Sequence, residues 1–371
     1  MQFSVEKAVL YNAIQQVAKV APSRSTLPIL NCILFTVEND ELTLRTTDLE
    51  ITMQTTIPVS GQENGTVAIP ARFISDITSE LPDTSLNFST EEELQVELTT
   101  EFGDYTIAGK DPEEFPALPV MDDQQNIELA NEVLNRLIDK SSFAVSRDEL
   151  KPALTGVLFQ FKDSEICAVA TDGHRLSRCI RTDVSSPNYE GDVIIPTKFL
   201  NIVSSNLDDK GDTNIQIGEN HVKIEFDNSV IYTRIINERF PDYESVIPDD
   251  NQKEALANID TLLSTLKRVN IFANKSTHQV TFSFDNNKLR VFTENPENNS
   301  SADENVTIQY TNDALTLGYN AAYVMDILRH LDTDDVIFHL KSPINAGLIY
   351  PSEQLDNEEI TMLLMPIRLN E

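Results

Sequence analysis

The sequence predicts an α+β fold built from three tandem copies of one domain, each with two helices and antiparallel sheet. Three strand ends introduce the copies: 66–70, 192–196 and 315–319. Each is followed by apolar residues at i, i+1 and i+4, which is one face of a helix. These residues are Phe73, Ile74 and Ile77; Phe199, Leu200 and Val203; and Tyr323, Val324 and Ile327. The spacings of 126 and 124 residues fit a whole small domain rather than a solenoid repeat.

A β-hairpin pattern precedes each strand end and finishes in Thr followed by an acid. The pairs are Thr47-Asp48, Thr171-Asp172 and Thr293-Glu294, each after alternating apolar residues around an Asn or Asp turn. Phe115-Pro116 and Phe240-Pro241 then close the first two copies, whereas the third ends in 365–368. We place the domains at residues 1–121, 122–250 and 251–371, with linkers at 117–126 and 242–254.

A first helix is predicted near the start of each copy. Its apolar stripes are Val9, Leu10, Ala13, Ile14 and Val17; Val133, Leu134, Leu137 and Ile138; and Leu262, Leu263, Leu266 and Val269. The six helical segments with their flanks are 6–24, 72–81, 132–151, 197–210, 260–275 and 320–331. They hold 14 Lys and Arg against 11 Asp and Glu, whereas the remaining sequence holds 14 against 49. Either short helices avoid acids in general, or the helices share one less acidic surface.

The net charge of −32 argues against a protein that coats DNA, because such a footprint is basic. No apolar run reaches the length of a membrane span, and the first residues lack the regions of a signal peptide. The three cysteines, Cys32, Cys167 and Cys179, lack metal-ligand spacing and fit buried thiols in a reducing cytoplasm. We expect a cytoplasmic location, no metal and no cofactor.

Two segments stand out for function. Residues 171–177 place Asp172, His174 and Arg175 close together, which resembles acid/base machinery. The other copies carry the Thr-acid pair without His, so a turn or cap is the simpler interpretation of Asp172. The segment 173–176 occurs only in the second copy, which suggests an added site. The apolar run 362–369 is either a buried final strand or a Met-rich wall of an adaptable pocket.

Several motifs together resemble the bacterial sliding clamp family, the β subunits of DNA polymerase III. They are 171–176, Arg239–Tyr243, 27–30, 47–50 and 365–369, and the resemblance covers all three copies. It implies a DNA clamp fold in which two chains join head to tail as a ring dimer. Helices then line the hole, sheets form the outside, and the ring encircles duplex DNA without sequence specificity. The family holds the replicative polymerase, the clamp loader, repair polymerases and other proteins on DNA through short peptides, and it is not an enzyme.

The resemblance also implies site residues. The partner-peptide pocket, between the second and third domains, comprises Leu154, Thr171, Gly173, His174, Arg175, Leu176, Pro241, Val246, Asn320, Tyr323, Ile344, Leu363, Met365, Pro366, Ile367 and Arg368. We expect His174, Arg175 and Arg368 to hydrogen-bond the peptide. Ser245 and Thr277 depart from the pattern, since some members carry Arg and an aromatic residue there.

The remaining expectations concern DNA and assembly. The cations expected to face or border the hole are Arg24, Arg72, Lys140, Arg147, Lys151, Lys198, Lys267 and Lys275. The resemblance implies a dimer interface in which Tyr105 and Ile107 supply an edge strand and Ile271 and Phe272 an apolar anchor. The acidic loop 297–304 is expected to pair with Arg72 or Lys110.

Two other functions remain compatible with parts of the sequence. One is a multidomain hydrolase that uses Asp172 and His174, and the other is a three-domain adhesion or scaffold protein. A ring that stays on circular DNA and slips off cut DNA distinguishes the clamp from both.

Overall fold

The computed structural model describes residues 1–22, 24–90, 94–122, 124–184, 189–208 and 210–369. The chain divides into two compact units. The first contains Met1–Glu132 and Lys198–Ile235, and the second contains Val133–Thr197 and Ile236–Glu371. The chain therefore passes between the units inside its middle copy, and each unit is considered by itself.

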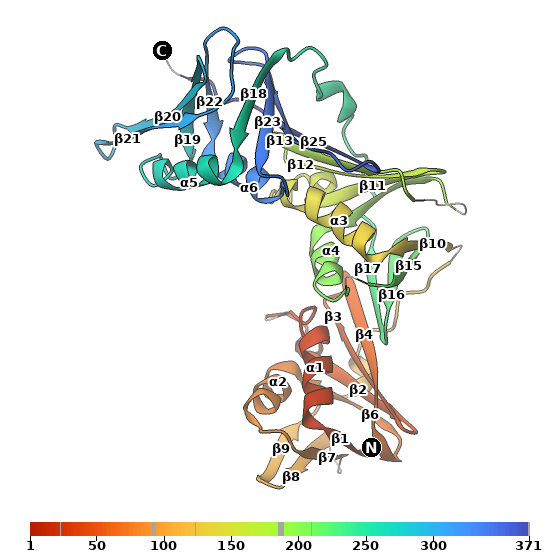
Figure 1. Cartoon of the computed structure of the whole chain (residues 1–371). Helices are drawn as coiled ribbons and strands as arrows, with labels where there is room; N and C mark the ends of the chain where they lie inside the picture. Colours follow the sequence, from red (N-terminus) through yellow and green to blue (C-terminus); the bar gives the residue numbers. More distant parts are fainter. Residues whose placement is uncertain (23, 91–93, 123, 185–188, 209, 370–371) are drawn as a thin grey trace. The chain divides into compact units, whose positions relative to one another are not determined.

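Every predicted helical segment contains an α-helix, so the helix predictions are confirmed (Figure 1). The helices are α1 (Lys7–Val17), α2 (Ala71–Glu80), α3 (Asn131–Ser141), α4 (Thr197–Ser204), α5 (Ile259–Val269) and α6 (Ala321–Arg329). Short 3-10 helices occur at η1 (Pro28–Asn31), η3 (Pro112–Glu114), η4 (Ser142–Ala144), η5 (Pro152–Thr155) and η6 (Glu244–Val246). No helix in these described stretches is long and apolar enough to span a membrane.

The predicted apolar stripes are buried with two main exceptions. In α4, Phe199, Leu200 and Val203 are buried as expected. In α2, Ile74 is buried but Phe73 is 67% exposed, so this member of the predicted apolar face lies outside the core. One helical residue turns the side chain by about 100°, and the buried line of α2 continues through Thr78 instead. Val9 of α1 is likewise 38% exposed.

The first unit contains a five-stranded and an eight-stranded antiparallel sheet. The order β5-β1-β7-β8-β9 is built from β1 (Gln2–Glu6), β5 (Ser60–Glu63), β7 (Ser85–Thr90), β8 (Gln95–Thr100) and β9 (Gly103–Ala108). The order β10-β15-β16-β17-β4-β3-β2-β6 uses β2 (Cys32–Glu38), β3 (Glu41–Thr47), β4 (Ile51–Pro58), β6 (Gly65–Pro70), β10 (Gln125–Ala130), β15 (Asp212–Ile217), β16 (His221–Phe226) and β17 (Ser229–Arg234). Alternating burial along these strands fits a sheet with one covered face.

The second unit contains an eight-stranded and a four-stranded antiparallel sheet. The order β14-β11-β12-β13-β25-β24-β23-β18 uses β11 (Gly156–Lys162), β12 (Glu165–Thr171), β13 (Arg175–Arg181), β14 (Gly191–Pro196), β18 (Lys253–Asn258), β23 (Asp335–Leu340), β24 (Gly347–Pro351) and β25 (Glu358–Leu364). The order β21-β20-β19-β22 uses β19 (Gln279–Asp285), β20 (Lys288–Asn295), β21 (Ser300–Thr307) and β22 (Leu315–Asn320). Much of the predicted acidic loop 297–304 is thus the polar strand β21.

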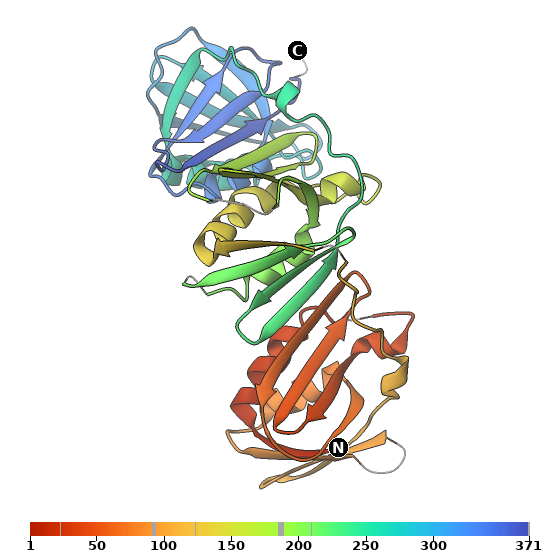
Figure 2. The same cartoon turned by 90° about the vertical axis from the view of Figure 1, so that its right-hand side faces the viewer.

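Neighbouring copies are joined by one continuous sheet at each junction. Strand β4 of the first copy pairs antiparallel with β17 of the second, from Thr55 opposite Ser229 to Ile51 opposite Thr233. Strand β13 of the second copy pairs with β25 of the third in the same way, as the yellow-green and dark blue strands of Figure 1 and Figure 2 show. Each junction therefore uses the third strand of one copy's hairpin set and the last sheet strand of the following copy.

A partly buried charge cluster ties α3 to the third copy within the second unit. The guanidinium of Arg136 donates to both carboxylate oxygens of Glu358, at 2.6 and 2.8 Å. Lys140 lies 1% exposed and donates to Asp332 at 3.0 Å, with Asp139 at 2.8 Å. Since Lys140 is buried and paired with two carboxylates, its prediction as a DNA-facing residue was wrong. It holds the joint between α3 and the third copy instead.

Candidate functional site

The segment peculiar to the second copy forms a tight turn between β12 and β13. The carboxylate of Asp172 accepts from the backbone N–H groups of His174 (2.8 Å) and Arg175 (3.0 Å), while the Thr171 hydroxyl donates to the carbonyl of Arg175 (2.6 Å). Gly173 has φ of 89°, which favours glycine. Asp172 is thus a turn residue, as the simpler interpretation held.

The first copy makes the same turn without glycine. Asp48 accepts from the N–H groups of Glu50 and Ile51 at 3.0 and 2.7 Å, and Leu49 takes φ of 79° where the second copy has Gly173. A leucine in the left-handed region is strained, so the first copy forms this turn with a less favourable backbone conformation than the second copy. In the third copy Thr293 and Glu294 lie inside β20 rather than at a turn. This Thr-acid pair is therefore not equivalent to the pairs of the first two copies.

Arg175 is buried, and each nitrogen of its guanidinium has a partner inside the chain. Its Nε lies 3.2 Å from Asp172, and its two terminal nitrogens donate to Asp326 (2.9 Å) and to the carbonyl of Phe143 (2.7 Å). The group also stacks over the ring of Tyr323, 4.4 Å from its centroid. Three of its five N–H groups are thus committed within the chain, and the expectation that Arg175 hydrogen-bonds a bound peptide stays a prediction. The residue ties the turn to α6.

The C-terminal segment is anchored to this turn and to β22. The backbone N–H of Met365 donates to the carbonyl of His174, and that of Ile367 donates to the carbonyl of Gly318, both at 2.8 Å. Just before it, Leu363 in β25 stands opposite Leu176 in β13. Residues 173–176 and 363–367, which are far apart in the sequence, thus lie side by side.

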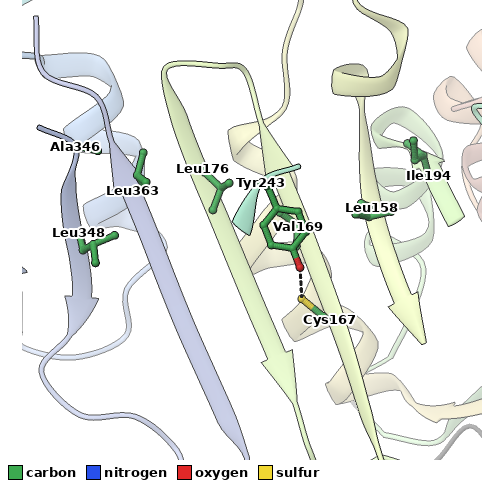
Figure 3. Close-up of a cluster of buried hydrophobic side chains, with 9 residues drawn as sticks. All are labelled: Leu158, Cys167, Val169, Leu176, Ile194, Tyr243, Ala346, Leu348 and Leu363. Atoms are coloured by element: carbon green, nitrogen blue, oxygen red, sulfur yellow. Dashed lines mark hydrogen bonds between the residues drawn. The ribbon is translucent and has the colours of Figure 1, made fainter. Parts of the chain in front are cut away.

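Residues 236–247, which include the first part of the predicted linker 242–254, pack across the sheet as an ordered strap. Its Tyr243 is buried in a cluster with Leu158, Cys167, Val169, Leu176, Ile194, Ala346, Leu348 and Leu363 (Figure 3). The Tyr243 hydroxyl donates to Gln160 at 2.6 Å. Burial raises the pKa of the Cys167 thiol to about 11, so that thiol stays protonated and unreactive.

A pocket of about 490 Å³ opens beside the strap. It is lined by Lys151, Pro152, Ala153, Leu154, Glu238, Arg239, Phe240, Pro241 and Asp242. Val246, Ile344 and Met365 are exposed apolar side chains, at 53%, 70% and 42%. The site thus offers a pocket and solvent-exposed apolar anchors on segments fixed by hydrogen bonds, an arrangement that fits a short peptide.

The remaining predicted pocket residues lie on elements fixed to this site. Asn320 caps α6 by accepting from the N–H groups of Ala322 (2.9 Å) and Tyr323 (3.3 Å), and Tyr323 contacts Arg175. Leu154 and Pro241 share the pocket described above. Leu176 and Leu363 are buried beneath it, whereas Pro366 is half-buried and Arg368 exposed in the C-terminal segment. Arg368 and His174 are the predicted donors that stay accessible.

Sequence reasoning missed residues that support the site without projecting into solvent. Tyr243 and Gln160 anchor the strap, and Phe143 and Asp326 hold Arg175. Only Tyr243 lay in a motif that had been noted, Arg239–Tyr243. Their partners are up to 151 residues away in sequence, and no local pattern reports such a pairing.

The cations predicted to face DNA differ in their surroundings. Arg24, Arg147, Lys151 and Lys267 are exposed, and Lys140 is buried as described. Arg72 lies 3.6 Å from Asp76, Lys198 pairs with Asp48, and Lys275 donates to the carbonyl of Ile271 at 3.4 Å. Seven of the eight therefore keep a solvent-accessible charge.

The residues predicted for assembly lie on and beside two unpaired sheet edges. Tyr105 and Ile107 belong to β9, the edge of the five-stranded sheet, although Ile107 is only 8% exposed. Ile271 and Phe272, after α5, are 64% and 41% exposed. In β21, Glu304 is bound by Arg268 and Asp303 by Arg290, so these two acids of segment 297–304 are already paired within the chain.

The geometry offers no support for hydrolysis at the turn. Asp172 is committed to backbone N–H groups and to Arg175, so it is poorly placed to act as a base for His174. Among the described residues, no group of three or more His, Cys, Asp or Glu is arranged to hold a metal ion.

Comparisons with known proteins match the whole length of the chain. Three family models of the DNA polymerase III beta subunit match in order: the N-terminal domain at residues 1–119, the central domain at 128–242 and the C-terminal domain at 244–368. The beta sliding clamp of Haemophilus influenzae is 31% identical, and that of Pseudomonas aeruginosa is 29% identical; each alignment covers both chains completely.

Solved structures agree with this match. The beta subunit of Pseudomonas aeruginosa superposes with a TM-score of 0.93 at 28% identity, and the sliding clamp of Bacillus subtilis with 0.92 at 26%, both over the full length of both chains. A sliding clamp of Pseudomonas aeruginosa bound to griselimycin also matches completely, with a TM-score of 0.92 at 28% identity. The chain, with its three tandem clamp domains, therefore belongs to the family of DNA polymerase III beta subunits, the bacterial sliding clamps.

Proposed function

We propose that two copies of this chain close head to tail into a ring around duplex DNA and hold the replicative polymerase on it. The observation that carries the proposal is the pairing rule at the two junctions within the chain. Each junction joins the third hairpin strand of one copy to the last sheet strand of the next, β4 to β17 and β13 to β25. By the same rule, β21 of the third copy and β9 of the first copy are the two strands left over.

Both leftover strands are sheet edges. β9 ends the order β5-β1-β7-β8-β9, and β21 begins the order β21-β20-β19-β22. An open edge presents unpaired backbone groups that can add a strand from another chain. Pairing β21 of one copy with β9 of a second extends the rule, and because the two edges differ, the contact is heterologous and forms a ring when it closes. Ile271 and Phe272 supply the exposed apolar surface beside this edge.

The encircled DNA is proposed to meet the helices. The helical segments are far less acidic than the rest of the chain, and Arg24, Arg72, Arg147, Lys151, Lys198, Lys267 and Lys275 keep accessible charges. A ring holds DNA by topology, so a few scattered cations are enough and strong phosphate contacts would slow sliding. The acidic remainder repels DNA from other surfaces.

The pocket beside the strap is proposed to bind the short peptides of partners, with Leu and Phe anchors. The partners are the replicative polymerase, the clamp loader and repair polymerases. Leu154 and Pro241 shape the pocket, Val246, Ile344 and Met365 add apolar contact, and His174 and Arg368 donate to the peptide. Each peptide is expected to bind at roughly micromolar Kd, with two pockets per ring adding avidity.

The proposal includes no catalysis and no cofactor, and it places the protein in the cytoplasm, where bacterial DNA is replicated. The domain boundaries proposed for it are 1–121, 122–250 and 251–371. Residues 370–371 lie outside the described residues and have no assigned role.

The test is retention on DNA of defined topology. After a clamp loader has placed the protein on nicked circular DNA, the protein should remain bound at high salt. It should leave once the circle is linearised, because a closed protein ring is retained only on DNA that has no free ends. The particle mass without DNA should be twice 41.6 kDa. Equal loss from circular and linear DNA would contradict the ring. In a variant with Arg24, Arg147 and Lys267 changed to Ala, loading should become less sensitive to salt.

A further inference from the structure

A second groove lies on the four-stranded sheet of the third copy. It encloses about 600 Å³ and is lined by Asn274, Thr277, Gln279, Thr281, Phe292, Thr293, Glu294, Pro296, Thr316 and Leu369. The register explains the set. Thr281 stands opposite both Phe292 in β20 and Gly318 in β22, so their side-chain positions share one face of the sheet.

Gly318 makes room for one wall of this groove. A Cβ built on Gly318 would lie 2.8 Å from a methyl carbon of Leu369 and 2.7 Å from the carbonyl oxygen of Ile367. The missing side chain therefore lets the C-terminal segment lie against β22 and place Leu369 over the sheet. The groove runs beside that leucine.

The groove adjoins residues that are predicted for the peptide pocket. Asn320, a predicted pocket residue that caps α6, pairs with Gln279 at one end of the groove, and Thr316 lines the groove four residues along β22. The C-terminal segment borders both sites, through Met365 at the pocket and Leu369 at the groove. At about 3.3 Å per residue, some four extended residues of a bound peptide would span it.

The charge of the groove has one sign. Glu294 is its only ionisable lining residue among those described, and it is exposed. Arg290 stacks over Phe292, 4.2 Å from the ring centroid, but its guanidinium donates to Oδ1 of Asp303 at 3.0 Å and to Oδ2 at 2.6 Å. The Arg290 charge is thus neutralised beside the groove, and the field inside it is that of a carboxylate among hydroxyl and amide groups.

We propose that this groove binds the residues flanking the anchors of a partner peptide and selects a Lys or Arg there, which pairs with Glu294. The inference rests on the proposed peptide pocket and adds a specificity element to it. The aliphatic stem of the cation lies along Phe292 and Leu369, while its charged end reaches Glu294. Partners whose anchor motif is followed or preceded by a basic residue therefore bind more tightly than partners with an acidic one.

The experiment compares synthetic peptides on the full chain by fluorescence anisotropy. One peptide carries only the Leu and Phe anchors, and others add a Gly-Ser-Lys-Ser or Gly-Ser-Glu-Ser flank at either end. At low salt the Lys flank at one end should tighten binding roughly threefold to tenfold over the short peptide, and the Glu flank should not. The Glu294→Lys variant should reverse this order. Asp285→Lys, an equal charge change at the exposed far end of the same hairpin, should behave as the unaltered chain.

The outcomes separate the two proposals. If the short peptide binds and neither Lys flank improves its affinity, the groove inference is overturned while the pocket stands. The same holds if the Lys gain persists in Glu294→Lys. If the short peptide does not bind at all, the pocket itself is wrong and the groove inference falls with it. The groove is supported if the preference between Lys and Glu flanks reverses in Glu294→Lys but not in Asp285→Lys. A misfolded variant would instead lose affinity for peptides with either flank.

Discussion

At the scale of single residues, the site depends on side chains that a bound peptide would not touch. The hydroxyl of Tyr243 donates to Gln160 from within the apolar cluster of Figure 3. That bond, with the 4.0 Å contact of the same hydroxyl to the Cys167 sulfur in Figure 3, helps to hold the strap. The neighbouring strap residues Pro241 and Val246 are proposed to meet the peptide. Buried contacts of Tyr243 thus help to position the proposed binding surface.

We predict that Tyr243→Phe lowers the free energy of unfolding by about 1–2 kcal/mol, because it leaves the carbonyl oxygen of Gln160 without its donor in a partly buried place. Chemical denaturation with an unchanged m-value measures the loss. Peptide affinity should also fall, since the strap is held less firmly.

Tyr350→Phe is the matched control for that change. Tyr350 packs against the same cluster, and no hydrogen bond of its hydroxyl is described. It should cost much less stability and leave peptide binding unchanged. Equal effects of the two substitutions would mean that the Tyr243 hydroxyl has no special role.

Residue types and spacing singled out candidate functional segments but could not tell which charges are free. Lys140 and Arg175 both lie in segments that the sequence singled out. In the structure Lys140 pairs with Asp332 and Asp139, and Arg175 pairs with Asp172 and Asp326. These partners come from other elements, so the pairing depends on tertiary packing. Phe73 is exposed for a local reason. A pattern of three apolar residues cannot decide which edge of the apolar stripe of a helix faces the core.

At the scale of elements, the joint between α3 and the third copy is electrostatic. Arg136 and Lys140 on α3 hold Asp332 and Glu358. Partial burial alone would raise the pKa of Asp332, but hydrogen bonds from Lys140 and Arg136 outweigh it, and the pKa lies below the ordinary value of 3.8. The ionised form is therefore bound more tightly in the folded chain than in the unfolded one.

A lowered pKa fixes the sign of the pH dependence. The stabilisation by Asp332 is fully present above about pH 4, the pKa of an unfolded Asp, and is lost as pH falls through the lower folded value. We predict that Asp332→Asn is less stable than the unaltered chain at pH 7 and that the difference narrows on acidification below about pH 4. Thermal unfolding at a series of pH values measures it.

The control for this prediction lies two residues away. Asp334 is exposed, and only its backbone carbonyl accepts hydrogen bonds in the described structure, so Asp334→Asn should show no such narrowing. A stability difference for Asp332→Asn that stays constant with pH would show that its carboxylate is not the titrating group.

The C-terminal segment is the element that borders both proposed binding sites. Removal of residues 365–371, the last two of which lie outside the described residues, should abolish peptide binding by deleting Met365 and Arg368 and the wall at Leu369. Dimer mass should not change, because β9, β21, Ile271 and Phe272 remain. Normal peptide affinity in the truncated chain would move the site elsewhere, which titration of a labelled peptide would reveal.

Periodicity predicted the elements well because helices and hairpins are local. All six helices and the hairpins around Asp40, Asp163 and Asn286 occur where the patterns indicated. Strand β21 was missed because an edge strand with polar residues on both faces lacks apolar alternation. The sequence also did not predict that strands of neighbouring copies join into eight-stranded sheets, because edge pairing between domains leaves no periodic pattern in the sequence.

At the scale of the whole molecule, the proposed assembly depends on the unpaired edges and on the apolar surface beside β21. We predict that Ile271→Ala with Phe272→Ala converts the dimer into monomers, because these side chains are 64% and 41% exposed in the single chain and would be buried at the contact. Light scattering at low protein concentration measures the mass.

An equal change elsewhere serves as the control. Val120→Ala with Leu355→Ala alters two exposed apolar residues, at 74% and 56%, away from either edge strand, and should leave the dimer intact. If the Ile271 and Phe272 variant remains a full dimer when diluted, the contact must use another surface.

The junction sheets have a consequence for how the ring responds to dilution. The pairings β4–β17 and β13–β25 are intramolecular, so they form at the high effective concentration of a tether and do not depend on how much protein is present. A pairing of β9 with β21 would be the same kind of contact made between separate molecules, and it alone would obey mass action. Of the three sheet-to-sheet seams per subunit, dilution would thus undo only the third, and the cell could set the number of closed rings through the amount of this chain.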